Sequence, residues 1–194
     1  MSYRSIQMLA RALRVLVILT LVLDVLVVLL VPVSVMTNAE NLFGGAGTFL
    51  HGLLHPGPDD ITAAGVAGIF LSWIWVWGSA LQAVTALFLV VCGICAAGIL
   101  RQGLRVLNTI LQNTPFIVQN AASLRRAAVF AFVIAGAALL RTVWGVWFYQ
   151  SLRPLATYNA LFVPIFAVFG LLCVVMAALF RQAAEMQAEN DLTI

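Results

Sequence analysis

Four long apolar runs constrain what this chain can fold into more than any other feature. They lie at residues 15–36, 77–100, 127–149 and 160–180. As an α-helix, a run of about 20 residues crosses the ~30 Å hydrocarbon layer of a bilayer. Inside a membrane no water satisfies free backbone groups, so a spanning segment of this kind is expected to be helical. The sequence therefore predicts an all-α fold, a four-helix transmembrane bundle formed by the single domain 1–194.

The arginines predict how this bundle is oriented. Eight of the ten lie before the first run, between the second and third runs, or directly after the fourth: Arg4, Arg11, Arg14, Arg101, Arg105, Arg125, Arg126 and Arg181. Segments rich in arginine that flank membrane spans stay on the cytoplasmic side. We therefore expect the N- and C-termini to be cytoplasmic.

The charge content argues against a soluble domain and against nucleic-acid binding. Charged residues make up 9% of the chain, whereas a soluble domain carries about 25%. The arginines are dispersed along the expected membrane borders, where they meet lipid phosphates. Binding a nucleic-acid backbone takes a dense basic patch, so we expect membrane lipid as a partner and no direct contact with nucleic acid.

The second apolar run is preceded by further apolar residues, so that 61–100 is longer than one crossing. Two crossings would put the two arginine-rich segments on opposite faces of the membrane. We therefore favour one long or kinked helix, in which 61–76 lies on the outer surface and 77–100 spans. The tryptophans support this arrangement, because all of them then fall at the outer interface that such rings prefer: Trp73, Trp75, Trp77, Trp144 and Trp147.

The segment 101–126 predicts an amphipathic helical hairpin on the cytoplasmic side. Leucines recur there at helical spacing, and polar side chains occupy the opposite face. Thr114 is expected to cap a second helix that begins at Pro115 and continues into the third span, because proline is favoured at the first helical position.

Two charged residues, Asp24 and Arg141, lie inside predicted spans. Ionisable groups at membrane depth are costly, so they normally face the bundle interior and pair with each other. One interpretation is the pathway of a small-solute or proton-coupled transporter. The other is a structural ion pair or an arginine that reaches the interface. We favour the structural interpretation, because transport usually needs more than one intramembrane polar pair.

The remaining motifs indicate neither an enzyme nor a metal or cofactor site. His51 and His55 have the i, i+4 spacing of metal ligands, but a proline follows directly and favours a plain loop. Cys92 and Cys95 lie inside a span, without the electropositive setting of a reactive thiol. With the neighbouring glycines and alanines they favour a small-residue surface for close packing, with 135–138 as its counterpart.

Two stretches of the chain resemble a known family. The segment Thr114-Pro115-Phe116-Ile-Val-Gln-Asn120-Ala-Ala-Ser-Leu124-Arg125-Arg126 matches a Pro-Phe…Asn…Leu-Arg pattern before the third span. The ending Glu189-Asn-Asp191-Leu192-Thr193-Ile194 matches an acidic Leu-Thr-Ile/Val terminus. Both patterns are similar to those of a bacterial four-span inner-membrane family catalogued as domain of unknown function 2975.

Members of that family are commonly encoded beside a small Cro/C1-type helix-turn-helix regulator. The resemblance therefore implies a multi-pass protein of the bacterial cytoplasmic (inner) membrane that binds or sequesters such a transcription factor. The candidate partner-binding residues are Arg101, Arg105, Pro115, Phe116, Asn120, Leu124, Arg125, Glu189, Asp191 and Leu192.

Three alternatives stay open. Pro115, Phe116 and Asn120 could simply build the turn beneath the third span. The chain could instead be a transporter that uses Asp24 and Arg141. It could also be an accessory subunit of a larger membrane complex or a homo-oligomer, which the small-residue surfaces would suit.

Overall fold

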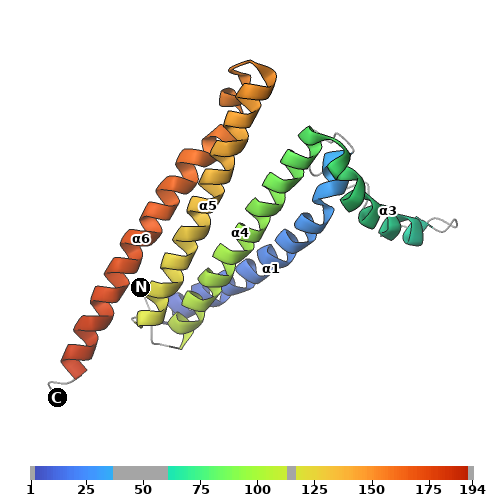
Figure 1. Ribbon diagram of the computed structural model, residues 1–194. Coiled ribbons are helices and arrows are strands. Elements are labelled where there is room, and N and C mark those ends of the chain that lie inside the picture. Colours follow the sequence, from blue (N-terminus) through green and yellow to red (C-terminus); the bar gives the residue numbers. More distant parts are fainter. Residues whose placement is uncertain (1–2, 37–60, 113–116, 192–194) are drawn as a thin grey trace. The chain divides into compact units, whose positions relative to one another are not determined.

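The computed structural model describes residues 3–36, 61–112 and 117–191, and the regular elements in these ranges are all helical (Figure 1). In chain order they are α1 (Tyr3–Met36), α3 (Ile61–Trp75), η1 (Val76–Gly78), α4 (Ala80–Leu111), α5 (Val118–Tyr149), η2 (Arg153–Ala156) and α6 (Tyr158–Asp191). The predicted all-α class is confirmed. The contacts divide the chain into two compact units, Val25–Gly93 and the remainder.

Four helices are long and apolar enough to cross a membrane: Gln7–Met36, Ala80–Leu111, Val118–Tyr149 and Tyr158–Glu189. They contain 30 or 32 residues each, so each is about 45 Å or more in length and exceeds the hydrocarbon layer by several turns. Large apolar side chains on them are exposed, among them Leu16, Leu140 and Leu171. This surface is compatible with lipid contact and with a multi-pass membrane protein.

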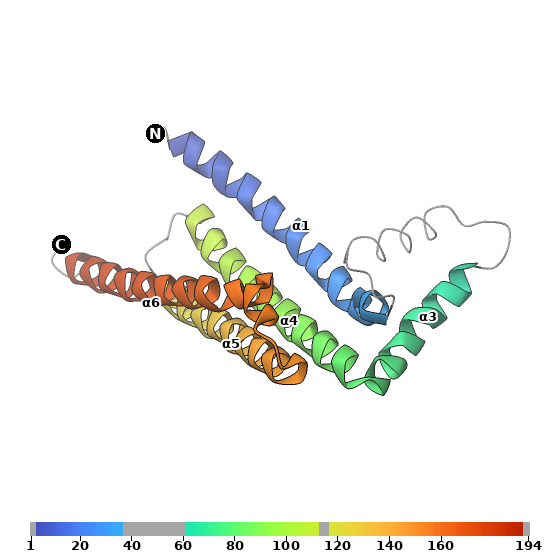
Figure 2. The ribbon, with the colours of Figure 1, turned by 90° about the horizontal axis from the view of Figure 1, so that it is seen from above.

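The segment 61–100, expected to form one long or kinked helix, is interrupted between its two expected parts. α3 ends at Trp75, η1 follows, and Ser79 has an extended backbone with φ −126° and ψ 128° before α4 begins. Figure 2 shows α3 turning away from the first half of α4. Val76 of η1 is fully buried in a cluster with Val31 and Ala86. The indole Nε1 of Trp73 donates to the carbonyl of Leu29 at 3.3 Å, so α3 is tied to the end of α1.

An antiparallel pair of helices, α5 and α6, forms the most extensive helix contact described (Figure 1). The buried face of α5 consists mainly of alanines at helical spacing, which lets the two backbones approach closely. Ala127 and Ala128 pack against Cys173 in this contact. The connection between the helices begins at Gln150, which has a left-handed backbone with φ 46°.

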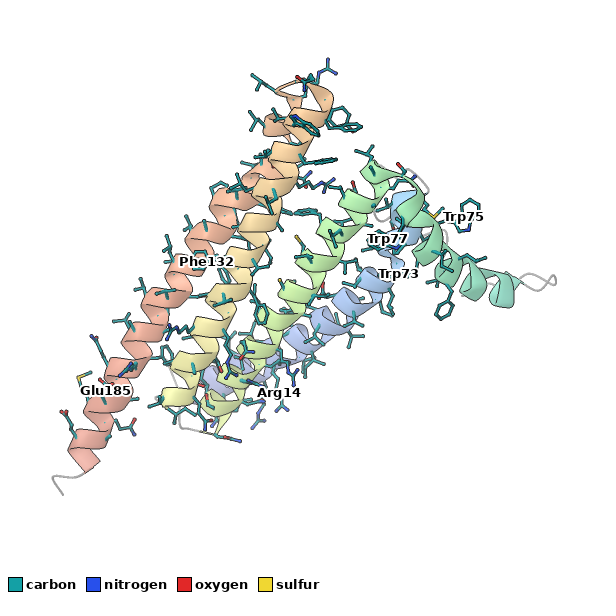
Figure 3. All side chains as sticks on the ribbon, in the orientation of Figure 1. Arg14, Trp73, Trp75, Trp77, Phe132 and Glu185 are labelled. Carbon is teal, nitrogen blue, oxygen red and sulfur yellow. The ribbon has the colours of Figure 1, made fainter. Side chains whose placement is uncertain are left out.

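Two phenylalanines of α5 cover glycines on the neighbouring helices. A Cβ atom on Gly98 of α4 would lie 2.7 Å from Cε2 of Phe130, and one on Gly170 of α6 would lie 2.9 Å from Cε1 of Phe132. Figure 3 labels Phe132. Close packing at the small residues of α4 was predicted with 135–138 as counterpart. At Gly98 the nearest atoms belong to the aromatic ring of Phe130 and not to 135–138.

Candidate binding site at the α4–α5 turn

The predicted hairpin consists of the ends of two long helices. α4 runs without a break to Leu111, and α5 begins at Val118. The expected helix start at Thr114 and Pro115 is wrong by three residues. Ile117 has an extended backbone with φ −117° and ψ 145°, and it accepts a 2.9 Å bond from the backbone N–H of Asn120. A helix that began at Pro115 would have to include Ile117. Thr114, Pro115 and Phe116 themselves lie outside the described residues.

A buried hydrogen-bond chain joins the two helix ends. The amide Nδ2 of Asn120 donates to Oγ1 of Thr109 at 2.7 Å, and that hydroxyl donates to the carbonyl of Val106 at 2.7 Å. Asn120 is only 1% exposed. A polar group buried this deeply is costly unless it is bonded, so the bond to Thr109 helps to hold α5 against α4. The burial of Asn120 favours the alternative in which this residue builds the turn.

Polar side chains from both helices line a cavity of about 480 Å³ beside this bond. α4 contributes side chains at i, i+3 and i+4, and α5 contributes side chains at i, i+4 and i+7, spacings that place each set on one helix face. These side chains are Arg105, Asn108 and Thr109 of α4 and Gln119, Ser123 and Arg126 of α5.

The cavity is electropositive. No carboxylate is among the described side chains that line it. Nη1 of Arg105 lies 3.4 Å from the neutral amide oxygen of Gln102, which leaves the positive charge of Arg105 uncompensated there. The N-terminus of α5 adds its partial positive charge, because the first N–H groups of a helix have no partner within it. The amide oxygen Oδ1 of Asn108 is buried and accepts no hydrogen bond from any described group.

The candidate partner-binding residues from the sequence divide between the cavity and other surfaces. Arg105 and Asn120 line the cavity. Arg101 and Arg125 are exposed on the same two helices but outside it, Leu124 is half-buried, and Leu192 lies outside the described residues. The sequence interpretation missed Arg126 as a site residue. The i, i+4, i+7 spacing of Gln119, Ser123 and Arg126 was the signal that could have revealed it.

The acidic end of α6 extends past the start of α5 (Figure 1). Equal steps along both helices from the Phe132–Gly170 contact put Val118 opposite Ala184, which is buried. The last two turns, which hold Glu185, Glu189 and Asp191, therefore continue about 10 Å beyond that point. Nε of Arg181 binds Oε1 of Glu185 at 2.8 Å; Figure 3 labels Glu185 on α6. Glu189 is exposed, and Asp191 ends the helix.

A family described as "Protein of unknown function (DUF2975)" matches residues 62–194. The chain belongs to this family. The matched range contains the whole of the α4–α5 turn and α6, so both the cavity and the acidic helix end lie within the DUF2975 region. No curated protein and no solved structure shows a significant match to the chain.

The two charged residues within the apolar helices of this DUF2975 chain have different surroundings. Nη1 of Arg141 lies 3.4 Å from Oδ1 of Asn159 on α6. Oδ2 of Asp24 is buried in α1 and has no hydrogen-bond partner among the residues that the structure describes. His51 and His55 fall in the range 37–60, outside the described part of the chain.

Proposed function

We propose that this protein is a non-enzymatic regulator of the bacterial inner membrane that binds a small cytoplasmic helix-turn-helix transcription factor. The observation that carries this proposal is the acidic end of α6, which continues as helix beyond the packed bundle. The arginine distribution favours the cytoplasm as the compartment of this end. The resemblance to a family whose genes often adjoin such a regulator supports the choice of partner.

Electrostatic complementarity explains how the contact would form. Arg181 is engaged by Glu185. Glu189, one turn further along, is exposed, and the sequence of α6 contains no basic residue besides Arg181. A DNA-binding helix carries basic side chains that neutralise phosphates. Carboxylates on a protruding helix attract such a surface and compete with DNA for it. Binding to the membrane protein would thereby keep the factor from its DNA sites.

Charge reversal at the end of α6 is expected to weaken binding of the transcription factor strongly. With Glu189→Lys and Asp191→Lys together, recovery of a helix-turn-helix protein should fall about tenfold or more, because attraction becomes repulsion. The measurement is purification of tagged full-length protein from host membranes in mild detergent, with quantitative mass spectrometry of the bound proteins. Gln182→Lys with Gln187→Lys serves as the control, because it adds the same number of lysines to the same helix without removing a carboxylate. Equal recovery with both variants would show that the acidic end is not the docking surface.

A transporter is the second candidate, and the buried, unpartnered Oδ2 of Asp24 favours it. A carboxyl group that binds and releases a proton inside a membrane is typical of proton pathways. In proteoliposomes with an imposed membrane potential, a pH-sensitive dye should then report proton flux by the native chain and its loss in Asp24→Asn. The control is Glu189→Gln, which lies outside the apolar run. Equal flux in the native chain and Asp24→Asn would reject this candidate.

A further inference from the structure

We propose that the cavity at the α4–α5 turn binds a phosphate-bearing polyol, with its phosphate between Arg105 and Arg126. This site does not depend on the acidic end of α6, on which the proposed docking of a transcription factor rests, because it is formed by α4 and α5. Both arginines line the same cavity from facing helices.

The charges in the cavity call for an anion. Two arginines line the cavity, and no carboxylate is among the described residues that line the space. Glu185, a carboxylate that pairs with an arginine, binds Arg181 on α6 and does not line the cavity. A guanidinium presents a planar fork of donors that fits phosphate oxygens in a bidentate manner, and two forks can hold one phosphate from opposite sides. Gln119, the second residue of α5, also lines the cavity, so the positive N-terminal end of that helix lies beside the bound phosphate.

The other polar groups point to a hydroxyl-bearing ligand. Asn108 lines the cavity, and its Oδ1 is a buried acceptor without a partner among the described groups. A hydrogen bond from a ligand hydroxyl to this oxygen would satisfy it. Gln119 and Ser123 add side chains that can donate or accept hydrogen bonds. The volume of about 480 Å³ falls in the range of small-molecule sites, about 300–1,000 Å³, and leaves room for a polyol attached to the phosphate.

Two kinds of ligand carry both a phosphate and hydroxyl groups: a lipid headgroup and a free polyol phosphate. Arg126 directly precedes the apolar run 127–149, and Arg105 follows the run 77–100 by five residues. Both arginines are therefore expected at the depth at which lipid headgroups lie. The phosphate and hydroxyls of a phosphatidylglycerol headgroup would fit there. A free polyol phosphate such as glycerol 3-phosphate carries the same groups.

Binding measurements on the purified full-length protein in detergent test the proposal and separate the sources. One arm titrates short-chain phosphatidylglycerol against short-chain phosphatidylcholine, and the other titrates glycerol 3-phosphate against glycerol. Arg105→Gln with Arg126→Gln should weaken binding of the phosphate-bearing polyol by about tenfold or more. Arg101→Gln with Arg125→Gln is the matched control, since both arginines are exposed on the same helices outside the cavity. The affinity of this control variant for the phosphate-bearing polyol should stay within about twofold of that of the native chain.

The two titrations and the two double variants together test whether the cavity binds the ligand and which source supplies it. Selective binding of phosphatidylglycerol alone supports the site and identifies a headgroup, whereas binding of glycerol 3-phosphate as well supports a free ligand. Equal loss in both double variants would overturn the proposal, because the attraction would then follow net charge rather than the cavity. Absence of binding in both arms would overturn it too. Circular dichroism and the thermal midpoint of each variant establish that it is folded.

Discussion

Replacing Gly98 or Gly170 with leucine is expected to destabilise the helix bundle by about 1–3 kcal/mol for each substitution. Even a single Cβ atom would lie 2.7 Å from the ring of Phe130 at Gly98 and 2.9 Å from the ring of Phe132 at Gly170. A leucine side chain is much larger, so the rings or the backbones must move apart. The thermal midpoint of the full-length protein in one detergent, followed by size-exclusion chromatography, measures the effect.

Two other glycines provide controls, because leucine at these positions is not expected to destabilise the bundle. Apart from the neighbouring residues and the backbone of the same helix, no described atom lies within 4 Å of a Cβ placed on Gly103 of α4 or Gly136 of α5. Leucine there should be neutral or stabilising by up to about 1 kcal/mol, because glycine is a poor helix former. If all four leucine variants lower the midpoint equally, then the phenylalanine contacts do not set the packing distance of these helices.

Replacing Asp24 with leucine is expected to favour membrane insertion of α1 by about 3 kcal/mol. The carboxylate lies in an apolar run, and its buried Oδ2 has no described partner. At the centre of a spanning helix an aspartate opposes insertion, whereas a leucine favours it. The apparent insertion free energy of residues 7–36, determined by glycosylation of flanking acceptor sites in microsomes, is the measurement.

Thr20→Leu is the matched control for Asp24→Leu, because Thr20 lies one turn earlier in α1. Its hydroxyl already donates to the carbonyl of Leu16 at 2.8 Å, so its removal should change the insertion free energy by less than about 1 kcal/mol. The same substitutions in the full-length protein show whether the bundle uses Asp24. A lower thermal midpoint for Asp24→Leu, despite easier insertion, would mean that the carboxyl group makes a stabilising contact in the assembled protein.

Several structural features followed from local properties of the chain. Run length and apolarity predicted the spanning helices, because these properties belong to each segment independently of its neighbours. The excess length of 61–100 predicted one long or kinked helix divided between 61–76 and 77–100, and the interruption lies at η1 and Ser79. Short motifs near Pro115 and Leu192 also predicted the family to which the chain belongs.

Other features depended on the partner that each side chain meets. The sequence showed Asp24 and Arg141 as the two charges within spans, but Arg141 lies beside Asn159, a residue that hydropathy does not single out. Gly98 was expected to face other small residues, and a phenylalanine ring covers it. The start of α5 was misplaced because proline and threonine preferences do not reveal that Ile117 stays extended.

From sequence alone, this protein is determined to be a helical, lipid-compatible chain with one polar, arginine-rich turn between its second and third spans. That information is local, because hydrophobicity and helix length act on each segment separately. Only the tertiary structure shows that Asn120 is buried against Thr109 and that Arg105 and Arg126 line the same cavity. Those facts depend on the relative rotation and approach of α4 and α5, which the packing of many side chains decides together.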